Sequence, residues 1–365
     1  MFEFGGLFCR NAGESFFIYL RYSVKNNIIN ILFFEEKDLM RTIRRNFGIF
    51  VLIIMMVISA SVGVLADSGA SDWMSGIDGD TKLSSVTIPG THDSATKNIG
   101  FSYVFKCQDT SIAEQLENGY RYLDIRLALD GDGASKKLIL KHSFAKCRKT
   151  DSMFSDALTL DDVLNDVYSF LDRHPSETVI MCMKAENGKD DTAEINRLLH
   201  EAIEERKSAW YLGSRIPTVD EARGKIVLAT RVVDKTNIRN GEGGLKMFWE
   251  DQGESDIYEK PYVETAINGN ESHFVQDRYN YAVTDKIDAL GYSLENCMAS
   301  EQSFFLNFAS TSGSGIIGHP KKYADEINDY LHKYEWKNKE NYGIIIVDFG
   351  TKELAEKIYK TNEIL

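Results

Sequence analysis

The sequence predicts a single large α/β domain over residues 67–365, folded as an irregular parallel (β/α)8 barrel of the TIM type. Two observations predict this class. Short apolar segments with the length of buried strands alternate with longer segments whose apolar residues recur at helical spacing. Charged or titratable residues also follow most of these apolar segments, as expected where the carboxyl ends of barrel strands meet at one face.

Eight strands and five helices are expected in this domain. The expected strands are 84–88, 122–127, 138–141, 178–183, 225–229, 273–275, 304–308 and 342–347. The expected helices are 111–118, 160–174, 192–207, 321–333 and 352–361. The helix at 160 has the clearest start, because Thr159 can cap it and Asp161 and Asp162 occupy its first turn. Residues 232–272 are rich in Gly, Asn and Glu without periodicity, which predicts long loops.

The residues before Asp67 have the order of a secretory signal peptide, which we assign to residues 40–66. A basic segment, 40–45, precedes an almost wholly apolar run, and Val64 to Ala66 offer small residues for cleavage. A retained membrane anchor is the alternative, because about twenty apolar residues can span a bilayer. Residues 1–39 lack the period of a domain, and we expect a gene-model extension or a disordered segment there. The domain from residue 67 is therefore expected to be secreted.

Composition restricts the partners of the protein. The formal net charge of −13 argues against nucleic acid and against purely electrostatic docking on anionic membranes. The cysteines after residue 66 have no metal-ligand spacing. Cys107 and Cys147 could form a disulfide in an exported protein, whereas Cys182 lies in an apolar segment and is expected to be a buried thiol.

The segment 83–94, LSSVTIPGTHDS, carries the most informative residues of the chain. Its strand ends on His92 and Asp93, and two further strands end on Arg126 and His142. Imidazoles exchange protons near neutral pH, and a guanidinium can neutralise phosphate oxygens. These residues therefore predict acid–base attack on a phosphate ester. Other strand ends carry Lys184, Arg231, Asp277 and Asp348.

In these motifs the chain resembles the bacterial phosphatidylinositol-specific phospholipases C of the X-domain type. The resemblance runs from about Leu83 to the C terminus. It rests on seven blocks in family order: IPGTHDS at 88–94, LDIR at 123–126, LKH at 140–142, PSETVI at 175–180 followed by Lys184, ARGKIVL at 222–228, VQDRY at 275–279 and IVD at 346–348. It implies a TIM-type barrel and cleavage of phosphatidylinositol by its own inositol 2-hydroxyl. The products would be diacylglycerol and inositol 1,2-cyclic phosphate, with slower hydrolysis of the cyclic diester and with glycosylphosphatidylinositol anchors as further substrates.

The resemblance also implies a role for each catalytic residue. His92 resembles the general base, paired with Asp348, and His142 resembles the general acid, paired with Asp93. Arg126 stands where calcium-dependent relatives hold their metal, which implies that the reaction needs no metal and no other cofactor. A surface ion pair with Asp124 is the alternative role for Arg126.

A pocket for the inositol ring is implied as well. Lys184, Arg231 and Asp277 resemble residues that bind inositol hydroxyls, and Tyr279 resembles a ring that stacks on the sugar. Three further pocket residues are carried over from the loop-rich half: Glu186, Trp249 and Asp251. The alternative for all seven is a structural salt bridge or a core aromatic. Since the cations are few, we expect a headgroup without further phosphates.

The expected partner is phosphatidylinositol in a membrane, contacted transiently by a monomer. The segments 100–105 and 313–318 are candidate membrane-contacting rims because they are apolar and flanked by glycine. One departure from the family is Ser143-Phe144, where a glycine usually follows the general acid. Two alternative functions remain: a catalytically silent inositol-lipid or glycan-binding module, and a glycerophosphodiesterase-like barrel, which would need clustered acidic metal ligands.

Overall fold

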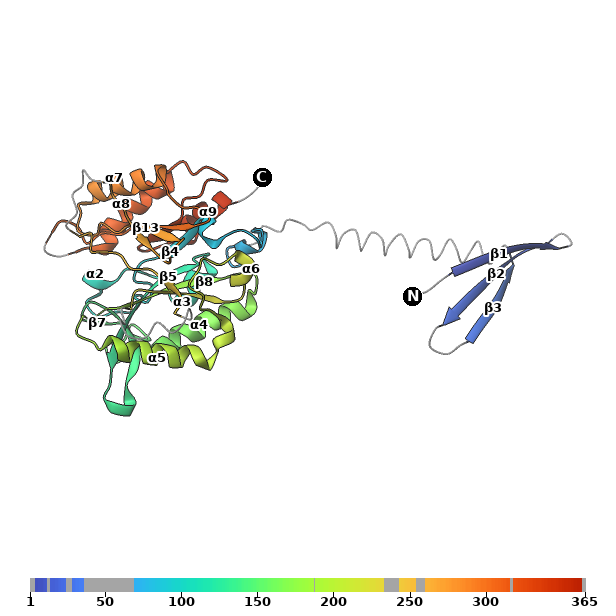
Figure 1. Ribbon diagram of the computed structural model, residues 1–365, viewed down its shortest axis with the longest axis horizontal. Helices are drawn as coiled ribbons and strands as arrows, with labels where there is room; N and C mark the ends of the chain where they lie inside the picture. The colour runs from blue at the N-terminus through green and yellow to red at the C-terminus, as the bar shows by residue number, and fades with distance from the viewer. Residues whose placement is uncertain are drawn as a thin grey trace. The chain divides into compact units, whose positions relative to one another are not determined.

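The computed structural model in Figure 1 describes residues 4–11, 14–23, 28–35, 69–186, 188–232, 243–253, 260–315 and 318–362. The chain divides into two units, Met1–Asp67 and Ser68–Leu365. In the first unit, strands β1 (Phe4–Asn11), β2 (Glu14–Ser23) and β3 (Ile28–Glu35) form an antiparallel sheet. The expected signal peptide at 40–66 lies outside the described residues. Whether residues 1–39 are a gene-model extension stays a prediction.

A largely parallel sheet forms the centre of the second unit. Eight parallel strands lie in the order β11 (Leu245–Lys246), β10 (Ile226–Thr230), β8 (Val179–Ala185), β5 (Tyr122–Asp130), β4 (Ile88–Thr91), β15 (Ile344–Val347), β14 (Ser303–Ala309) and β13 (Ser272–Gln276). The short β12 (Val263–Ala266) pairs antiparallel with β13. No backbone pairing joins β11 to β13 in the described part of the chain, so the ring of strands has one open seam.

Side chains bridge this seam. Nε2 of His273, on β13, lies 3.0 Å from the carbonyl oxygen of Phe248, which follows β11. Burial lowers the pKa of His273 to about 4, so the ring is neutral and Nε2–H donates to that carbonyl. The buried Gln252 donates to the carbonyl of Val275 at 3.1 Å and accepts from the N–H of Asp277 at 3.3 Å. These contacts fix the loop after β11 against the strand that carries part of the site.

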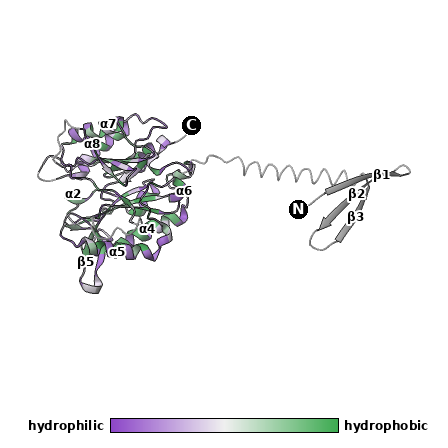
Figure 2. Ribbon diagram, in the orientation of Figure 1, coloured by the Kyte–Doolittle hydropathy of each residue, from purple (hydrophilic) through white to green (hydrophobic). Residues whose placement is uncertain are grey.

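Helices surround the sheet. They are α2 (Ser102–Phe105), α3 (Ile112–Glu117), α4 (Leu160–Arg173), α5 (Thr192–Glu205), α6 (Val219–Ala222), α7 (Val283–Glu295), α8 (Pro320–Lys333) and α9 (Lys352–Tyr359). Figure 2 shows that α4 and α5 carry both hydrophobic and hydrophilic residues. In α4 the predicted apolar stripe is buried, and Thr159 caps the first turn by accepting from the N–H of Asp162 at 3.2 Å. Within the described residues, none of the helices combines the length and apolarity that a bilayer span requires.

A buried ion pair lies at the end of the barrel opposite the strand carboxyl ends. Arg121, just before β5, donates from Nε to Glu177, just before β8, at 2.9 Å. Arg121 also donates to the carbonyls of Leu116 at 2.6 Å and Ala70 at 3.1 Å, and Glu177 accepts from the N–H of Met74 at 3.1 Å. Each charge is therefore compensated by several hydrogen bonds, as burial of an ion pair requires.

The structure differs from the sequence predictions for three strands and one long helix. The segment predicted as a strand at 138–141 is β6 (Lys137–His142), which pairs antiparallel with β5 in a hairpin and takes no place in the parallel order. The strand predicted at 84–88 starts only at Ile88, after a 3-10 turn. The eighth parallel strand is β11, within the stretch predicted as loops. Helix α7 was not predicted, because Ala282 provides no cap and Gly291 interrupts its pattern.

Candidate active site

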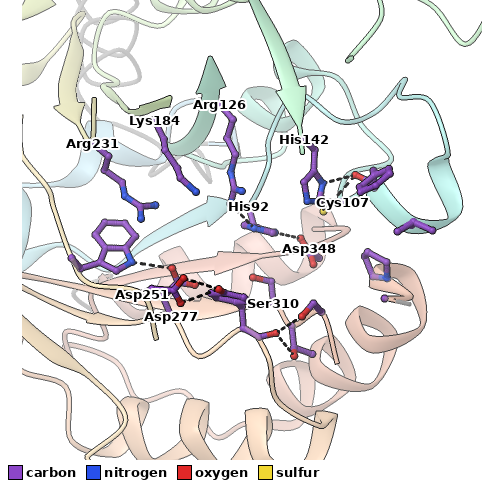
Figure 3. A pocket seen from close by; sticks show the side chains of 18 residues that line it. His92, Cys107, Arg126, His142, Lys184, Arg231, Asp251, Asp277, Ser310 and Asp348 are labelled. Atoms are coloured by element: carbon purple, nitrogen blue, oxygen red, sulfur yellow. Dashed lines mark hydrogen bonds and ion pairs between the residues drawn. The ribbon is translucent and has the colours of Figure 1, made fainter. Parts of the chain in front are cut away.

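A cavity of about 510 Å³ opens where the parallel strands end (Figure 3). Strands β4, β5, β8, β10, β13 and β15 each deliver a charged or titratable side chain to it, because parallel strands place their carboxyl ends on the same face. Ten predicted site residues line the cavity: His92, Arg126, His142, Lys184, Arg231, Trp249, Asp251, Asp277, Tyr279 and Asp348. The other two, Asp93 and Glu186, lie behind the lining in contact with Arg126.

His92 is held on both ring nitrogens. Its Nδ1 lies 2.8 Å from Oδ1 of Asp348, and its Nε2 lies 2.9 Å from Nη2 of Arg126 and 3.3 Å from Oδ2 of Asp93. Burial disfavours a charged ring, but the carboxylates of Asp348 and Asp93 outweigh it and raise the pKa of His92 to about 9. Asp348 keeps a proton on Nδ1, so Nε2 is the nitrogen that can take up or release a proton in the cavity.

Asp93 follows His92 in the chain, and its carboxylate contacts that ring as well as Arg126 and His142. Its φ of +41° is in the left-handed region, which aspartate tolerates better than most residues. Burial raises the pKa of Asp93, whereas Arg126, His142 and His92 lower it. Oδ1 of Asp93 lies 2.9 Å from Nε of Arg126, and Oδ2 lies 3.4 Å from Nδ1 of His142. Arg126 is therefore the nearer partner of Asp93.

His142 reaches the cavity by a route that the sequence did not predict. Because β6 runs antiparallel to β5, the end of β6 returns to the level of Arg126. The ring centroid of His142 lies 6.4 Å from that of His92. Nδ1 of His142 has its nearest acceptor in the carbonyl oxygen of Phe105, at 2.8 Å. This bond directs Nδ1–H away from the substrate space and leaves Nε2 for proton exchange.

Arg126 is surrounded by carboxylates and still lines the cavity. Nη2 lies 3.1 Å from Oδ2 of Asp124, and Nη1 lies 3.4 Å from Oε2 of Glu186. Burial alone would raise the pKa of Asp124, but the positive charges of Arg126 and His92 outweigh burial and lower that pKa. Asp124 was expected at most as a surface partner, but its side chain is buried and orients the guanidinium. Its signal in the sequence is its place two residues before Arg126 on the same strand.

Glu186 also supports the loop that follows His142. Its Oε1 accepts from the N–H of Ser143 at 2.6 Å. Burial raises the pKa of Glu186, but Arg126 and Lys184 outweigh it and the net shift is downward. Ser143 has a φ of +54°, a conformation that glycine adopts most easily, so the glycine that the resemblance led us to expect at this position would be less strained.

The far side of the cavity alternates donors and acceptors. The guanidinium of Arg231 lies 3.4 Å from the ring centroid of Trp249, and Nε1 of Trp249 donates to Asp277 at 2.9 Å. The hydroxyl of Tyr279 donates to Asp251 at 2.9 Å. Each of these residues is thus held by a neighbour, while all of them line the cavity.

Lys184 projects from the end of β8 beside Arg126. The positive charge of Arg126, followed by burial, lowers the pKa of Lys184. Its nearest carboxylate is Glu186, whose Oε2 lies 3.9 Å from Nζ. Lys184 is therefore only loosely paired and can donate to a hydroxyl in the cavity.

Several lining residues were not predicted as part of the pocket, although three of them lie in the two predicted rim segments, because sequence reasoning looked for charge in the pocket. They come from the helix after β4, the residues after β14 and the start of α8: Val104, Phe105, Cys107, Ser310, Thr311, Ser312, Gly318 and Pro320. The position after β14 is the signal that could have found the hydroxyl residues. Cys107 and Cys147 are both free thiols, so the disulfide considered for them is not formed.

One group among the described residues could hold a metal ion. His92, Asp93 and Cys107 offer ligand atoms that all lie within 4.8 Å of one another. No cluster of three carboxylates in the described ranges has that spacing, which disfavours a glycerophosphodiesterase-like metal site. The absence of a metal requirement stays a prediction.

Comparison with known proteins shows which proteins the chain is similar to. Residues 86–232 match the family profile described as phosphatidylinositol-specific phospholipase C, X domain. Over this segment the chain is similar to that family. A 1-phosphatidylinositol phosphodiesterase from Staphylococcus aureus is 28% identical over 344 residues, which cover 86% of this chain and 98% of the relative. The enzyme of the same name from Listeria monocytogenes is 27% identical over 308 residues, 80% of this chain and 84% of the relative.

Solved structures of the family confirm the fold. A mutant of the phosphatidylinositol-specific phospholipase C from Staphylococcus aureus has a TM-score of 0.66 at 25% identity and covers 81% of this chain and 98% of its own. The enzyme from Listeria monocytogenes has a TM-score of 0.60 at 24% identity, with 81% and 100% covered. The expected irregular TIM-type barrel is therefore confirmed.

Proposed function

We propose that this protein is a phosphatidylinositol diacylglycerol-lyase. The observation that carries the proposal is that His92, His142 and Arg126 line one cavity, with the two imidazole centroids 6.4 Å apart. Hydrogen bonds in general acid–base catalysis span about 2.6–3.2 Å, so rings at this separation can both reach one phosphodiester. The curated relatives named 1-phosphatidylinositol phosphodiesterase support the same reaction.

In the first step, Nε2 of His92 takes the proton of the inositol 2-hydroxyl, and that oxygen attacks phosphorus. The bond from phosphorus to the diacylglycerol oxygen breaks, and His142 gives that oxygen a proton. Arg126 neutralises the non-bridging oxygens, where charge develops. Asp348 holds His92 in the productive tautomer and stabilises its cation. Water then opens the cyclic phosphate more slowly, with the two histidines exchanging roles.

The cavity suits an inositol ring without further phosphates. Its cations Arg126, Lys184 and Arg231 face Asp251, Asp277 and Asp348 from the other strand ends. Such a lining offers donors and acceptors to neutral hydroxyls and leaves little positive charge for additional phosphates. Glycosylphosphatidylinositol anchors contain the same bond and are proposed as further substrates.

Membrane contact is proposed at the rim beside α2. Phe101 and Tyr103 are each 73% exposed, and Phe144 packs against Phe101 with ring centroids 5.8 Å apart. Exposed aromatic rings at a cavity mouth favour peripheral contact with lipid. In the second candidate rim, residues 316 and 317 lie outside the described residues. We further propose that the protein acts as a secreted monomer.

The test is release of inositol 1,2-cyclic phosphate from phosphatidylinositol vesicles in EDTA. His142→Ala should lose about 10²–10⁴-fold in turnover while the protein still binds the vesicles. The control is His200→Ala, on α5 and outside the cavity lining, which should retain full turnover. A silent binding module would show vesicle binding and no cyclic product. Activity that is lost in EDTA and restored by calcium would contradict the metal-free mechanism.

A further inference from the structure

Two atoms beside the cavity, Sγ of Cys107 and Oδ2 of Asp93, transfer no proton in the proposed reaction. Cys107 lines the cavity as a free thiol and takes part in no catalytic step. Oδ2 of Asp93 makes no hydrogen bond in the described part of the chain, although Asp93 is only 2% exposed. This oxygen faces the two imidazoles at ion-pair distance and keeps free capacity to bind a cation.

The separations around this oxygen suit a tetrahedral metal. Oδ2 of Asp93 lies 3.3 Å from Nε2 of His92 and 3.4 Å from Nδ1 of His142. Sγ of Cys107 lies 3.9 Å from Nδ1 of His142. With zinc–ligand bonds of about 2.0–2.3 Å, a tetrahedral site has ligand pairs about 3.4 Å apart for N and O and about 3.6 Å apart for N and S. Small side-chain shifts would bring these atoms to that geometry.

The surroundings of His92 are those of a zinc-bound histidine. Asp348 accepts from Nδ1 of His92 at 2.8 Å, so in the neutral ring Nε2 carries the lone pair. Histidines that bind metal generally donate their other N–H to a carboxylate or carbonyl in this way. The ligand set of imidazole, carboxylate and thiolate is also one that zinc favours over calcium or magnesium.

Arg126 is the group that opposes a cation here. Its Nη2 lies 2.9 Å from Nε2 of His92 and would have to swing away. Asp124 and Glu186 remain as partners for the displaced guanidinium, at 3.1 and 3.4 Å in the structure. The buried acids therefore allow the change without leaving Arg126 unpaired.

We propose that His92, Asp93 and Cys107 form an inhibitory Zn²⁺ site, with His142 or water as the fourth ligand. Zinc binds Nε2 of His92, Oδ2 of Asp93 and Sγ of Cys107, and the thiol and the protonated His92 ring each release a proton to solvent. His142 joins only by giving up its bond to the carbonyl of Phe105. The bound ion occupies the nitrogen that would accept the substrate proton. The inhibition rests on the proposed function, whereas the binding does not.

Binding is tested first, without any assay of turnover. The purified protein competes with a chromophoric chelator for Zn²⁺, and Co²⁺ is added separately to record the ultraviolet charge-transfer band of a cobalt–thiolate bond. We expect one tight site per chain, a thiolate band, and loss of the band in Cys107→Ser. The control Cys297→Ser removes a thiol elsewhere, at the end of α7, and should leave both readouts unchanged. Zinc bound only by surface carboxylates and histidines would give no band and the same affinity in Cys107→Ser, which would overturn the proposal.

Inhibition is tested second, as the ratio of turnover with and without Zn²⁺ within each variant. The wild type and Cys297→Ser should be inhibited reversibly, with full recovery in EDTA. Cys107→Ser should need at least about 10-fold more zinc for the same inhibition, because one ligand is lost. Equal zinc sensitivity of the two variants would refute the site. A protein that binds zinc through Cys107 but cleaves no phosphatidylinositol would refute the proposed function and leave the site standing.

Discussion

Replacing Asp348 with asparagine tests the central electrostatic argument about the base. Asp348 contacts Nδ1 of His92 at 2.8 Å, and its carboxylate is the largest of the influences that raise the pKa of the ring. Asparagine keeps the size of the side chain and removes its charge. The variant therefore changes the proton affinity of His92 with little change in packing.

The magnitude follows from the shift of the pKa of His92 from 6.5 to about 9. At about 1.4 kcal/mol per pH unit, this shift corresponds to about 3 kcal/mol in favour of the charged ring. Burial opposes it, so the two carboxylates together contribute more than the net shift. Removing one of them should lower the pKa of His92 by more than about one unit. The maximal rate should also fall, by about 10²–10⁴-fold, because the base loses its orienting partner.

The assay is the pH dependence of kcat/KM on a water-soluble inositol phosphodiester. A base must be unprotonated to act, so kcat/KM of the wild type should fall as the pH drops below the pKa of His92. This acid limb of the pH profile should lie well above pH 6.5. In Asp348→Asn this limb should move to lower pH. Asp277→Asn is the control, since Asp277 lines the cavity without contacting His92, and it should alter KM but not the limb. A wild-type limb near pH 6.5 that stays in place in Asp348→Asn would refute the reasoning.

Three other predictions concern charge and burial. Arg126→Lys keeps a positive charge but loses the planar guanidinium with its paired N–H donors. Turnover should fall at least about 10²-fold, and calcium should not restore it. A smaller loss would show that a single positive charge is enough. Glu177→Gln leaves Arg121 buried and uncompensated, and urea denaturation should show a loss of about 3–5 kcal/mol, against less than about 1 kcal/mol for Glu117→Gln at an exposed pair. Burial lowers the pKa of His273 to about 4 in the folded state. Between about pH 6.5 and pH 4 this histidine is therefore protonated in the unfolded state and neutral in the folded state. As the pH falls through that window, the free energy of unfolding should decrease by about 3 kcal/mol. The same pH dependence in His273→Gln would contradict this assignment.

The fold was largely predictable because buried strands and amphipathic helices have characteristic patterns of apolar residues in the sequence. Strand β8 is buried along five consecutive residues, and α4 has both its cap and its apolar stripe, so both were found. β11 was not found, because two residues carry no period and its place is fixed by pairing with β10. The direction of β6 was equally hidden, since a strand looks the same in either orientation and only the hairpin reverses it.

The site was predictable where a charged residue ends a strand, and less so where function depends on what lies beside it. Ten of the predicted residues line the cavity because the barrel brings strand ends together. The partners were harder to predict. Asp93 was expected to serve His142, but it lies 2.9 Å from Arg126 and 3.4 Å from His142, and nothing in the sequence encodes that difference.

This arrangement suggests how a guanidinium can act in place of a metal ion. A free arginine has many rotamers, whereas Arg126 is held by Asp93, Asp124 and Glu186 before any substrate arrives. Those carboxylates offset much of the charge of Arg126. Its stabilisation of the negative charge that develops on the phosphate therefore depends more on the direction of its N–H groups than on its net charge. Burial then makes each directed hydrogen bond stronger than it would be in water. Removal of one carboxylate should thus harm catalysis by letting the guanidinium turn, even though it leaves the cavity more positive.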